Sequence, residues 1–472
     1  MSLVNAFQEM GRPTWLTRRR LLINAGLSAA GAAIVGRHEA FVANAEASAQ
    51  ERGLAPGKRP VAGPTPIELT CVDADVRTYS GTFQSHNQKV VQNARGIFMT
   101  HVRTRNAAYT AQEWRLSRSR DGGHSFTTIF SATNATNPPV LESDAEGNIS
   151  LGRPDFINTN AYLYRFLAKE DYRSPHISRI EGGSAGKYAM MLDEPRRQLY
   201  WFAHNRTFAR LDLEGGVLTC TKLFSHPSPA GLEYPQMSLD AHGVLHAAWT
   251  TVMVPSPVPG ERFVYWDIHY MQSPDGGLTW RTMAGAPISI PVPADNSGPT
   301  DRITLDDEFE VSTWLANLLV KEGKAHFLYM AQTEPRRQHY VRCDLGSHRR
   351  ELDLQPQFAG QGLSLSGQDG FFVSRRNVSN STLYCVAHDA GAPRLGCLAS
   401  NDNGSTWYDY AIGDKVTQLY AVGGCREITP DGWVIGSFTD RLSPKSAGSE
   451  VTDTARVYFF RIRAGVKRQS RA

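Results

Sequence analysis

The stretch Ser273-Pro274-Asp275-Gly276-Gly277-Leu278-Thr279-Trp280 has the composition of a tight turn that follows a strand. Its serine, aspartate, glycine and large aromatic residue return at the same spacing in 119–126 and in 400–407. In such a turn the aspartate accepts hydrogen bonds from backbone amides, the glycine adopts a positive φ, and the aromatic ring covers the loop. We therefore predict three hairpin turns with a structural role. Their defining residues are Ser119, Asp121, Gly123, Phe126, Ser273, Asp275, Gly277, Trp280, Ser400, Asp402, Gly404 and Trp407.

A recurring unit of roughly 40 to 60 residues contains these turns, which indicates a repeat architecture. In each unit a short strand enters a tight turn, and a more apolar strand returns from it. The returning strands are predicted at 95–101, 147–153, 197–204, 243–249, 323–329, 381–388 and 432–438. These units predict an all-β, seven-bladed β-propeller, with 67–72 pairing near 456–462 to close the ring. A β-sandwich or jelly roll is the alternative, but it would explain the turns and not the repeat.

The three turns resemble the Asp-boxes of the sialidase-like propellers, which are also known as BNR repeats. The resemblance rests on the serine, aspartate, glycine and aromatic positions named above. It implies a propeller with Asp-box hairpin turns between the third and fourth strands of units one, four and six.

The N-terminal segment has the features of an export signal. It contains Thr17-Arg18-Arg19-Arg20-Leu21-Leu22, then an apolar run at 23–35 and a small-residue cleavage site at 43–45. This order predicts a twin-arginine signal over 1–45 and a periplasmic or secreted protein. An uncleaved membrane anchor is the alternative, although the apolar run is short for a bilayer. We expect a linker at 46–66, the propeller at 67–465 and a C-terminal tail at 466–472.

The overall composition excludes some classes of partner. The chain has 472 residues and a formal net charge of +4, which gives no reason to expect a nucleic-acid-binding surface. Its 41 glycines and 26 prolines suit many short strands that are joined by turns. We expect a monomer that has no membrane segment once the signal is removed.

The cysteines and acidic clusters do not predict a metal centre. Six cysteines are scattered without metal-ligand spacing, and we expect them to be free and buried. A Cys385–Cys397 bridge across a hairpin is the alternative. Asp306, Asp307 and Glu308 could bind a structural Ca²⁺, but loop salt bridges are the simpler interpretation. We therefore expect no metal and no cofactor.

One face of the predicted disc should carry the functional site. Because neighbouring strands alternate in direction, first strands begin and second strands end on the face opposite to the hairpin turns. The side chains at these positions suit an acidic carbohydrate, because aromatic rings stack on sugars and Arg or His binds carboxylates. The candidates for substrate binding are Asn87, Tyr188, His204, Tyr234, Arg302, Trp314 and His388. A structural interpretation stays open for each, since strand-end histidines are often simply hydrogen-bonded and aromatic residues can fill blade interfaces.

The residues His86-Asn87, His101 and Arg153 resemble a pattern in the BNR-repeat polysaccharide lyases, which include ulvan lyases and rhamnose–glucuronate lyases. The resemblance implies β-elimination at a uronate of an acidic polysaccharide. In that interpretation His86 and His101 are the catalytic acid/base residues, and Arg153 is the catalytic residue that neutralises the carboxylate. Replacement of His101 by alanine would then abolish turnover and leave the fold intact.

The sequence departs from the family pattern at one position. The family tyrosine would fall near Thr136 and Asn137, and neither residue can act as a base. Tyr188, Tyr234 or a histidine would then take that role, or the chemistry differs. Two other functions stay open: a sialidase-like exo-glycoside hydrolase, for which no tyrosine–glutamate nucleophile pair can be assigned, and a carbohydrate-binding propeller without catalysis.

Overall fold

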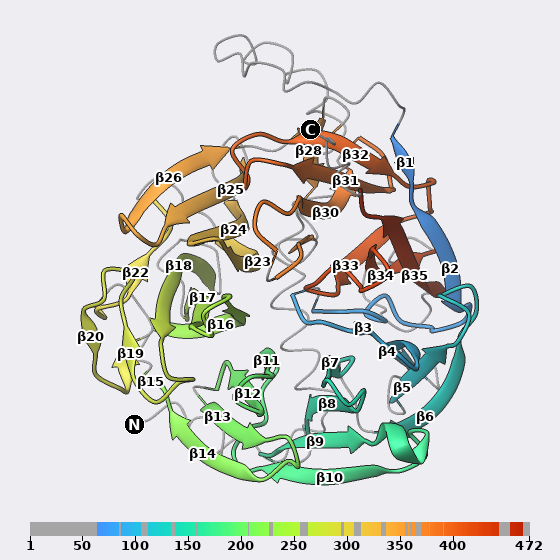
Figure 1. Ribbon diagram of the computed structural model, residues 1–472, viewed down its shortest axis with the longest axis horizontal. Coiled ribbons are helices and arrows are strands. Elements are labelled where there is room, and N and C mark those ends of the chain that lie inside the picture. The colour runs from blue at the N-terminus through green and yellow to red at the C-terminus, as the bar shows by residue number, and fades with distance from the viewer. Residues whose placement is uncertain are drawn as a thin grey trace, which may run out of the picture.

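The computed structural model describes most of the chain after residue 63, and the described residues form a seven-bladed β-propeller (Figure 1). The fold class predicted from the sequence is therefore confirmed. In the part of the chain that is described, the only helix is the 3-10 turn η1 (Ala168–Glu170), and no helix is long and apolar enough to cross a membrane. The described ranges are 64–84, 86–104, 112–133, 137–155, 159–205, 207–225, 230–254, 263–293, 297–305, 313–331, 337–354, 357–358, 361–364, 370–376, 378–389 and 391–442 together with 454–465.

Blades one to three are regular four-stranded antiparallel sheets, numbered from the axis outward. Blade one contains β3 (Val90–Asn93), β4 (Gly96–Thr104), β5 (Gln112–Ser119) and β6 (Thr127–Thr133). Blade two contains β7 (Val140–Ser143), β8 (Ile149–Pro154), β9 (Ala161–Phe166) and β10 (Pro175–Ile180). Blade three contains β11 (Tyr188–Asp193), β12 (Gln198–Ala203), β13 (Thr207–Asp212) and β14 (Val217–Lys222).

Blades four to seven follow the same plan, and blades four and six carry additional short strands. Blade four contains β16 (Ala230–Leu239), β17 (Leu245–Met253), β18 (Val264–Ser273), β19 (Trp280–Arg281), β20 (Pro287–Ile288) and β22 (Asp301–Arg302). Blade five contains β23 (Thr313–Lys321), β24 (Lys324–Ala331), β25 (Arg337–Asp344) and β26 (Arg349–Leu354). Blade six contains β29 (Phe371–Val373), β30 (Leu383–Asp389), β31 (Leu395–Ser400) and β32 (Tyr408–Ile412), with β27 (Gln357–Phe358) and β28 (Gln361–Ser364) at its inner edge. Blade seven contains β33 (Leu419–Gly424), β34 (Trp433–Arg441), β35 (Ala455–Arg463) and β2 (Glu68–Asp73), and β15 (Phe224–Ser225) pairs separately with β21 (Val292–Pro293).

The ring is closed by the start of the described chain. β2 pairs antiparallel with β35, in a register that places Glu68 opposite Arg461 and Leu69 opposite Phe460. In Figure 1 the blue β2 lies against the red β35 as the outer strand of blade seven. The predicted pairing of 67–72 with 456–462 is therefore confirmed. One further short strand, β1 (Thr65–Pro66), lies inside the range expected as linker and extends blade six in parallel to β32.

The three aspartate turns adopt one geometry, between the third and fourth strands of blades one, four and six. In the turn at 273–280, the Ser273 hydroxyl donates to Asp275 Oδ1 at 2.9 Å, and Asp275 accepts hydrogen bonds from the amides of Leu278 and Thr279. The other two turns repeat the serine–aspartate bond at 2.7 and 2.8 Å. Each carboxylate thus holds its turn together by accepting these hydrogen bonds.

Each aspartate turn also packs against the blade before it. The turn aromatics Phe126, Trp280 and Trp407 lie 5.1, 5.5 and 5.1 Å from Phe459, Phe208 and Tyr340, respectively. Gly404, the glycine of the turn at 400–407, has φ +85°, and a Cβ built there would overlap the Tyr340 hydroxyl. The glycine is therefore required both for the backbone conformation and for the close approach of the neighbouring blade.

The six cysteines are all free. Cys385 and Cys397 lie on paired strands but are offset by one register position, because Cys385 stands opposite Leu398 and Val386 opposite Cys397. Successive residues of a strand point to opposite faces, so the two thiols face different inter-blade cores. The alternative of a Cys385–Cys397 bridge is therefore wrong. Cys71 and Cys220 are exposed, and this also corrects the expectation that all six are buried.

Candidate active site on the open face

The two faces of the disc differ in their local regularity. We call the face with the aspartate turns the turn face, and the face where first strands begin and second strands end the open face. Three first strands, β16, β23 and β33, lose their regular register near the open face, and in β16 and β33 a non-glycine residue of the bulge also has a positive φ. β16 shifts between Glu233 and Gln236, where Pro235 has no N–H to donate to β17, and Tyr234 has φ +50°. Such bulges turn side chains away from the ordinary pleat.

The second bulge with a positive φ lies in β33 of blade seven. Its register shifts between Tyr420 and Gly423, and Ala421 has φ +54°. A non-glycine residue in the left-handed region is uncommon and costs free energy, so it persists only where the surrounding structure enforces it. Both bulges therefore show that the strands depart from the regular blade repeat at the open face.

Aromatic rings form a row across the open face, and we call this row the aromatic arc. Its members are Tyr420, Phe83, Tyr234, Tyr265 and Trp314. Tyr420 and Phe83 are stacked at 6.3 Å, Tyr234 and Tyr265 are 5.4 Å apart, and Tyr265 and Trp314 are 5.2 Å apart. The row thus spans blade seven, the segment before β3, and blades four and five.

Two cations lie among these rings. Lys187 Nζ is 5.1 Å from the centre of the Phe83 ring and 5.3 Å from that of Tyr234, so it fills the gap in the arc. Arg441 stacks 4.0 Å from the Tyr420 ring. Burial lowers the pKa of Lys187, and the nearby Glu233 carboxylate opposes that shift. A partly desolvated ammonium between two rings would gain from an anionic ligand.

A histidine–glutamate pair lies at the edge of the arc. His204 follows directly after β12, and its backbone N–H donates to the Lys187 carbonyl at 3.0 Å. Its Nδ1 lies 3.7 Å from Glu233 Oε2, and the two side chains are 24% and 20% exposed. The pair is thus open to solvent beside a cation and an aromatic surface.

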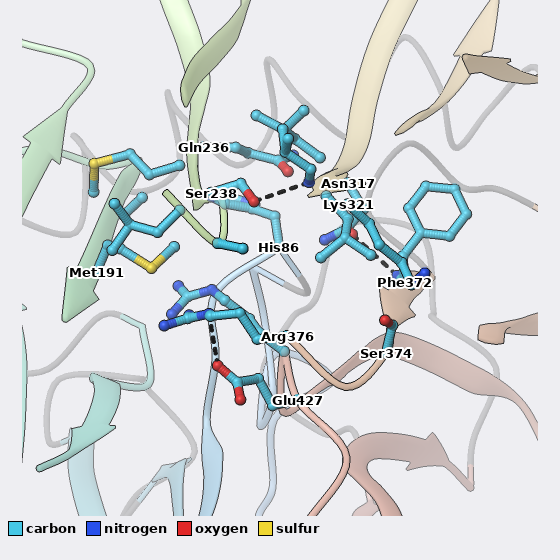
Figure 2. A pocket seen from close by; sticks show the side chains of 18 of the residues that line it. His86, Met191, Gln236, Ser238, Asn317, Lys321, Phe372, Ser374, Arg376 and Glu427 are labelled. Carbon is cyan, nitrogen blue, oxygen red and sulfur yellow. Dashed lines mark hydrogen bonds and ion pairs between the residues drawn. The ribbon is translucent and has the colours of Figure 1, made fainter. Parts of the chain in front are cut away.

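His86 lies under the arc, at the inner end of an axial cavity (Figure 2). Its ring packs edge-on against Tyr234 at 5.9 Å, and the residue is 7% exposed. Neither ring nitrogen forms a hydrogen bond of normal geometry among the described residues, and the backbone of Tyr188 is close enough to oppose the effect of burial on the ring. Burial lowers the pKa of His86 well below its ordinary value, and the charges of Lys89 and Lys187 lower it further. His86 is therefore a neutral imidazole at physiological pH.

The axial cavity runs from His86 toward the turn face. It has a volume of about 40 Å³ and is lined mainly by the first strands of blades three to six, with Gln236, Ser238 and Asn317 among the polar lining residues (Figure 2). At its far end lies the ion pair of Arg376 and Glu427, at 2.8 Å. A cavity of this size has room for about three water molecules.

A buried polar group beside this cavity ties the blades together at the axis. Arg426 of blade seven forms an ion pair with Glu142 of blade two and donates to the Met190 carbonyl of blade three at 2.8 Å. Gln88 accepts the Arg426 backbone N–H at 2.9 Å and donates to Glu142 at 3.0 Å. Burial raises the pKa of Glu142, and Arg426 opposes that shift. Because Arg426 and Glu142 are far apart in the sequence, no local pattern indicates their meeting.

His101 lies in the interface between blades one and seven. It sits three residues before the end of β4, and not at the strand end as expected. Its Nε2 is 3.2 Å from Asp73 Oδ2, and the same carboxylate lies 3.3 Å from Arg115 and 3.6 Å from Arg103. Burial would raise the pKa of Asp73, but the bond and charge of His101, helped by the Asp75 amide and Arg103, lower it to about 2. His101 thus has an acidic partner in the ring closure.

Arg153 lies between blades one and two. Its guanidinium stacks 5.6 Å from the rings of both Tyr162 and Tyr164, donates to the Tyr164 hydroxyl at 3.2 Å, and donates to the Pro154 carbonyl at 3.2 Å. His86, His101 and Arg153 therefore have different neighbours, at the axis and in two different interfaces. Their catalytic roles stay predictions.

The other sequence candidates fall into three groups. Tyr234, Trp314 and His204 lie in or beside the arc. Tyr188 donates to the Pro138 carbonyl at 2.9 Å and stacks on Trp201, which is the interface-filling arrangement considered from the sequence. The remaining candidates lie elsewhere: Asn87 donates to Gln84, Arg302 pairs with β18 at the outer side of blade four, and His388 pairs with Leu395 in blade six.

Some sequence predictions fall outside the described residues. Thr136 and the acidic residues Asp306, Asp307 and Glu308 are among them. Within the described ranges, no group of three or more histidine, cysteine, aspartate or glutamate side chains could hold a metal ion.

Sequence reasoning missed Lys187 and Glu233, although a signal was present. Each directly precedes a tyrosine, Tyr188 and Tyr234, that the blade alignment had placed on the open face. Tyr265 is the second residue of the third strand of its blade and Phe83 lies before the first strand, so neither occupied a position that the alignment considered.

Comparisons with known proteins find similar structures but no matching family model or curated sequence. A PL25 ulvan lyase solved with a saccharide of GlcA and Rha3S matches with a TM-score of 0.56 and 11% identity, over 83% of this chain and 95% of that chain. The polysaccharide lyase Uly1 matches with a TM-score of 0.51 and 8% identity, over 84% of this chain and 99% of that chain. These TM-scores show that the fold is shared, and at such low identities they show the fold alone.

A glycoside hydrolase is also among the similar structures. The α-L-arabinofuranosidase Arb93A of Fusarium graminearum, solved with an iminosugar inhibitor, matches at 10% identity over 85% of this chain and 98% of that chain. Its TM-score of 0.41 is too low to bear on the function of this chain.

Proposed function

We propose that this protein is an exported enzyme that cleaves an acidic, uronate-containing polysaccharide by β-elimination at the aromatic arc. The observation that carries the proposal is the position of Lys187, a partly desolvated ammonium between the rings of Phe83 and Tyr234. Sugar rings stack on aromatic faces, and the positive charge of this ammonium attracts the carboxylate of a uronate. The shared fold with polysaccharide lyases agrees with this proposal.

The chemistry requires charge neutralisation at one point. A base removes the proton from the carbon α to the uronate carboxylate, and that C–H electron pair forms the new double bond to the β carbon. The bond from the β carbon to the glycosidic oxygen breaks, and this oxygen leaves with a proton. Because the α proton is weakly acidic, the negative charge on the carboxylate side must be stabilised in the transition state. We assign this stabilisation to Lys187.

The proposal is tested with purified protein and a panel of glucuronate-containing polysaccharides. β-Elimination forms a conjugated, ultraviolet-absorbing product, so we expect absorbance to rise with at least one member. Lys187→Met should lower kcat/KM about 100-fold, because a charge partner of the transition state is lost. Lys169→Met, at an exposed position on η1 in blade two, is the matched control and should retain full activity. New reducing ends without the chromophore would overturn elimination in favour of hydrolysis.

A carbohydrate-binding propeller without catalysis is the second candidate. Two of the side chains that the lyase resemblance makes catalytic, His101 and Arg153, are buried against protein partners. If this candidate holds, polysaccharide will be retarded in a native gel together with the protein, and its length and absorbance will not change.

We propose export by the twin-arginine route from the sequence of residues 1–45, which lie outside the described residues. Replacing Arg18 and Arg19 by lysine should retain the protein in the cytoplasm. Cell fractionation measures this, and unchanged export of the variant would contradict the proposal.

A further inference from the structure

On the open face, the imidazole of His204 is both accessible and paired with a carboxylate. His204 is 24% exposed and lies 3.7 Å from Glu233. His86 lies beneath Tyr234 and close to cations, and the Nε2 of His101 is directed to Asp73. Among these three histidines, His204 is therefore the one that a polysaccharide on the arc can reach.

The backbone and a neighbouring glycine hold the His204 ring in place. The His204 N–H donates to the Lys187 carbonyl at 3.0 Å, which fixes the histidine beside the residue that carries the ammonium. The ring lies against Gly186, where a Cβ would come within 3.2 Å of His204 Cε1. A side chain at residue 186 would push the ring away, so the glycine leaves room for this orientation.

The carboxylate of Glu233 faces one nitrogen of the ring. His204 Nδ1 is buried without a hydrogen-bond partner, and Glu233 Oε2 is the acidic atom nearest to it in an ion pair. Closing this gap would let Nδ1–H donate to the carboxylate, and catalytic hydrogen bonds are often long before substrate binds. That tautomer leaves the lone pair of Nε2 to accept a proton, and Glu233 stabilises the imidazolium that forms.

We propose that His204, oriented by Glu233, is the base that removes the α proton of a uronate whose carboxylate is held by Lys187. The proton moves from the α carbon to Nε2, the C–H electron pair becomes the double bond, and the glycosidic oxygen leaves from the β carbon with a proton from solvent. His204 thus takes the role for which the sequence offers no tyrosine at Thr136 or Asn137. Glu233 is a positioning residue. This inference rests on the proposed function.

The test uses the full-length protein and the polysaccharide that gives the fastest absorbance rise. His204→Ala should lower kcat about 1,000-fold with KM nearly unchanged, as expected for loss of a general base. Added imidazole should restore part of the activity of this variant, because the space left by the ring admits a free base. Glu233→Gln should lower kcat about tenfold to 100-fold, again with little change of KM.

Two further variants keep the test decisive. His204→Gln is of similar size and serves if His204→Ala does not fold. His176→Ala, at an exposed position on the outer strand of blade two, is the matched control and should behave as wild type. If wild type forms product and a folded His204 variant keeps more than about a third of its kcat, the inference on His204 is overturned and the proposed function stands. If wild type forms no product with any polysaccharide, the proposed function itself fails.

Discussion

The turn face and the open face of this propeller are built in opposite ways. On the turn face, three aspartate turns repeat one set of hydrogen bonds and one contact with the preceding blade. On the open face, three first strands bulge, two of these bulges contain a non-glycine residue with positive φ, and cations lie between aromatic rings. The repeated turn hydrogen bonds therefore lie where the role is structural, and the departures from regular strand register lie at the candidate site.

Position on the open face is not sufficient for a functional role. His101–Asp73 and His204–Glu233 are both imidazole–carboxylate pairs near the ends of second strands. His101 is 1% exposed, and its carboxylate partner also contacts two arginines, whereas His204 is 24% exposed and lies beside the arc. We therefore expect the His101–Asp73 pair to stabilise the ring closure and the His204–Glu233 pair to take part in catalysis.

The largest effect is expected on the turn face. Gly404→Ala places a Cβ on the Tyr340 hydroxyl at φ +85°. We expect a loss of about 4 kcal/mol of unfolding free energy, of which about 1 comes from the backbone and the rest from the clash. Gly285→Ala is the matched control, because it has the same φ and open space around the site. Urea denaturation measures both, and equal losses in the two variants would contradict the inter-blade contact.

The next effect separates the two imidazole–carboxylate pairs. His101→Ala removes one partner of the buried Asp73 and should lower the unfolding free energy by about 3 kcal/mol. His204→Ala, at a more exposed pair, should cost less than about 1 kcal/mol. Thermal and urea unfolding of both variants test this. A His101→Ala variant of unchanged stability but without activity would restore the catalytic role that the sequence suggests.

A pH dependence follows from the same ring closure. Folding lowers the pKa of Asp73 from 3.8 to about 2, so its stabilisation is present above about pH 4 and is lost as the pH falls toward 2. At pH 7 the lowered pKa of Asp73 contributes about 2 kcal/mol to the free energy of unfolding. Asp73→Asn should therefore be less stable than wild type by that amount at pH 7, with the difference shrinking toward pH 2. A difference that does not depend on pH would contradict the ion pair.

The smallest effect is expected at an exposed aspartate turn. Asp275→Ala removes hydrogen bonds to Ser273, Leu278 and Thr279, and should cost about 1 kcal/mol because these groups can bind water instead. Differential scanning calorimetry should show a lower Tm, and product formation should match wild type. Loss of activity at an unchanged Tm would place the site near the turn face.

Much of the fold was predictable because it depends on neighbours in the sequence. Each predicted second strand coincides with a strand of the structure, from β4 to β34, and the closure of β2 against β35 follows from counting the repeat. The Cys385–Cys397 alternative fails for an equally local reason, since an offset of one residue sends the two thiols to opposite faces of the sheet.

The candidate site was predictable only in outline. The blade alignment selected the face and the neighbourhoods of Tyr188 and Tyr234, but not Lys187 or Glu233. It also grouped His86, His101 and Arg153, whose side chains have different partners in the structure. Strand alternation gives the face of the blade on which a side chain lies, but it does not give the distant partner that the side chain meets there.

The sequence by itself determined the repeat, the aspartate turns and the closing strand, because turn hydrogen bonds and strand alternation act over a few residues. Only the tertiary structure decided which polar groups are desolvated and which stay open. Arg426 meets Glu142 at the axis, His101 meets Asp73 between blades, and His204 meets Glu233 beside the arc. Burial and charge pairing depend on these distant partners, and they separate a stabilising imidazole from one that is available for catalysis.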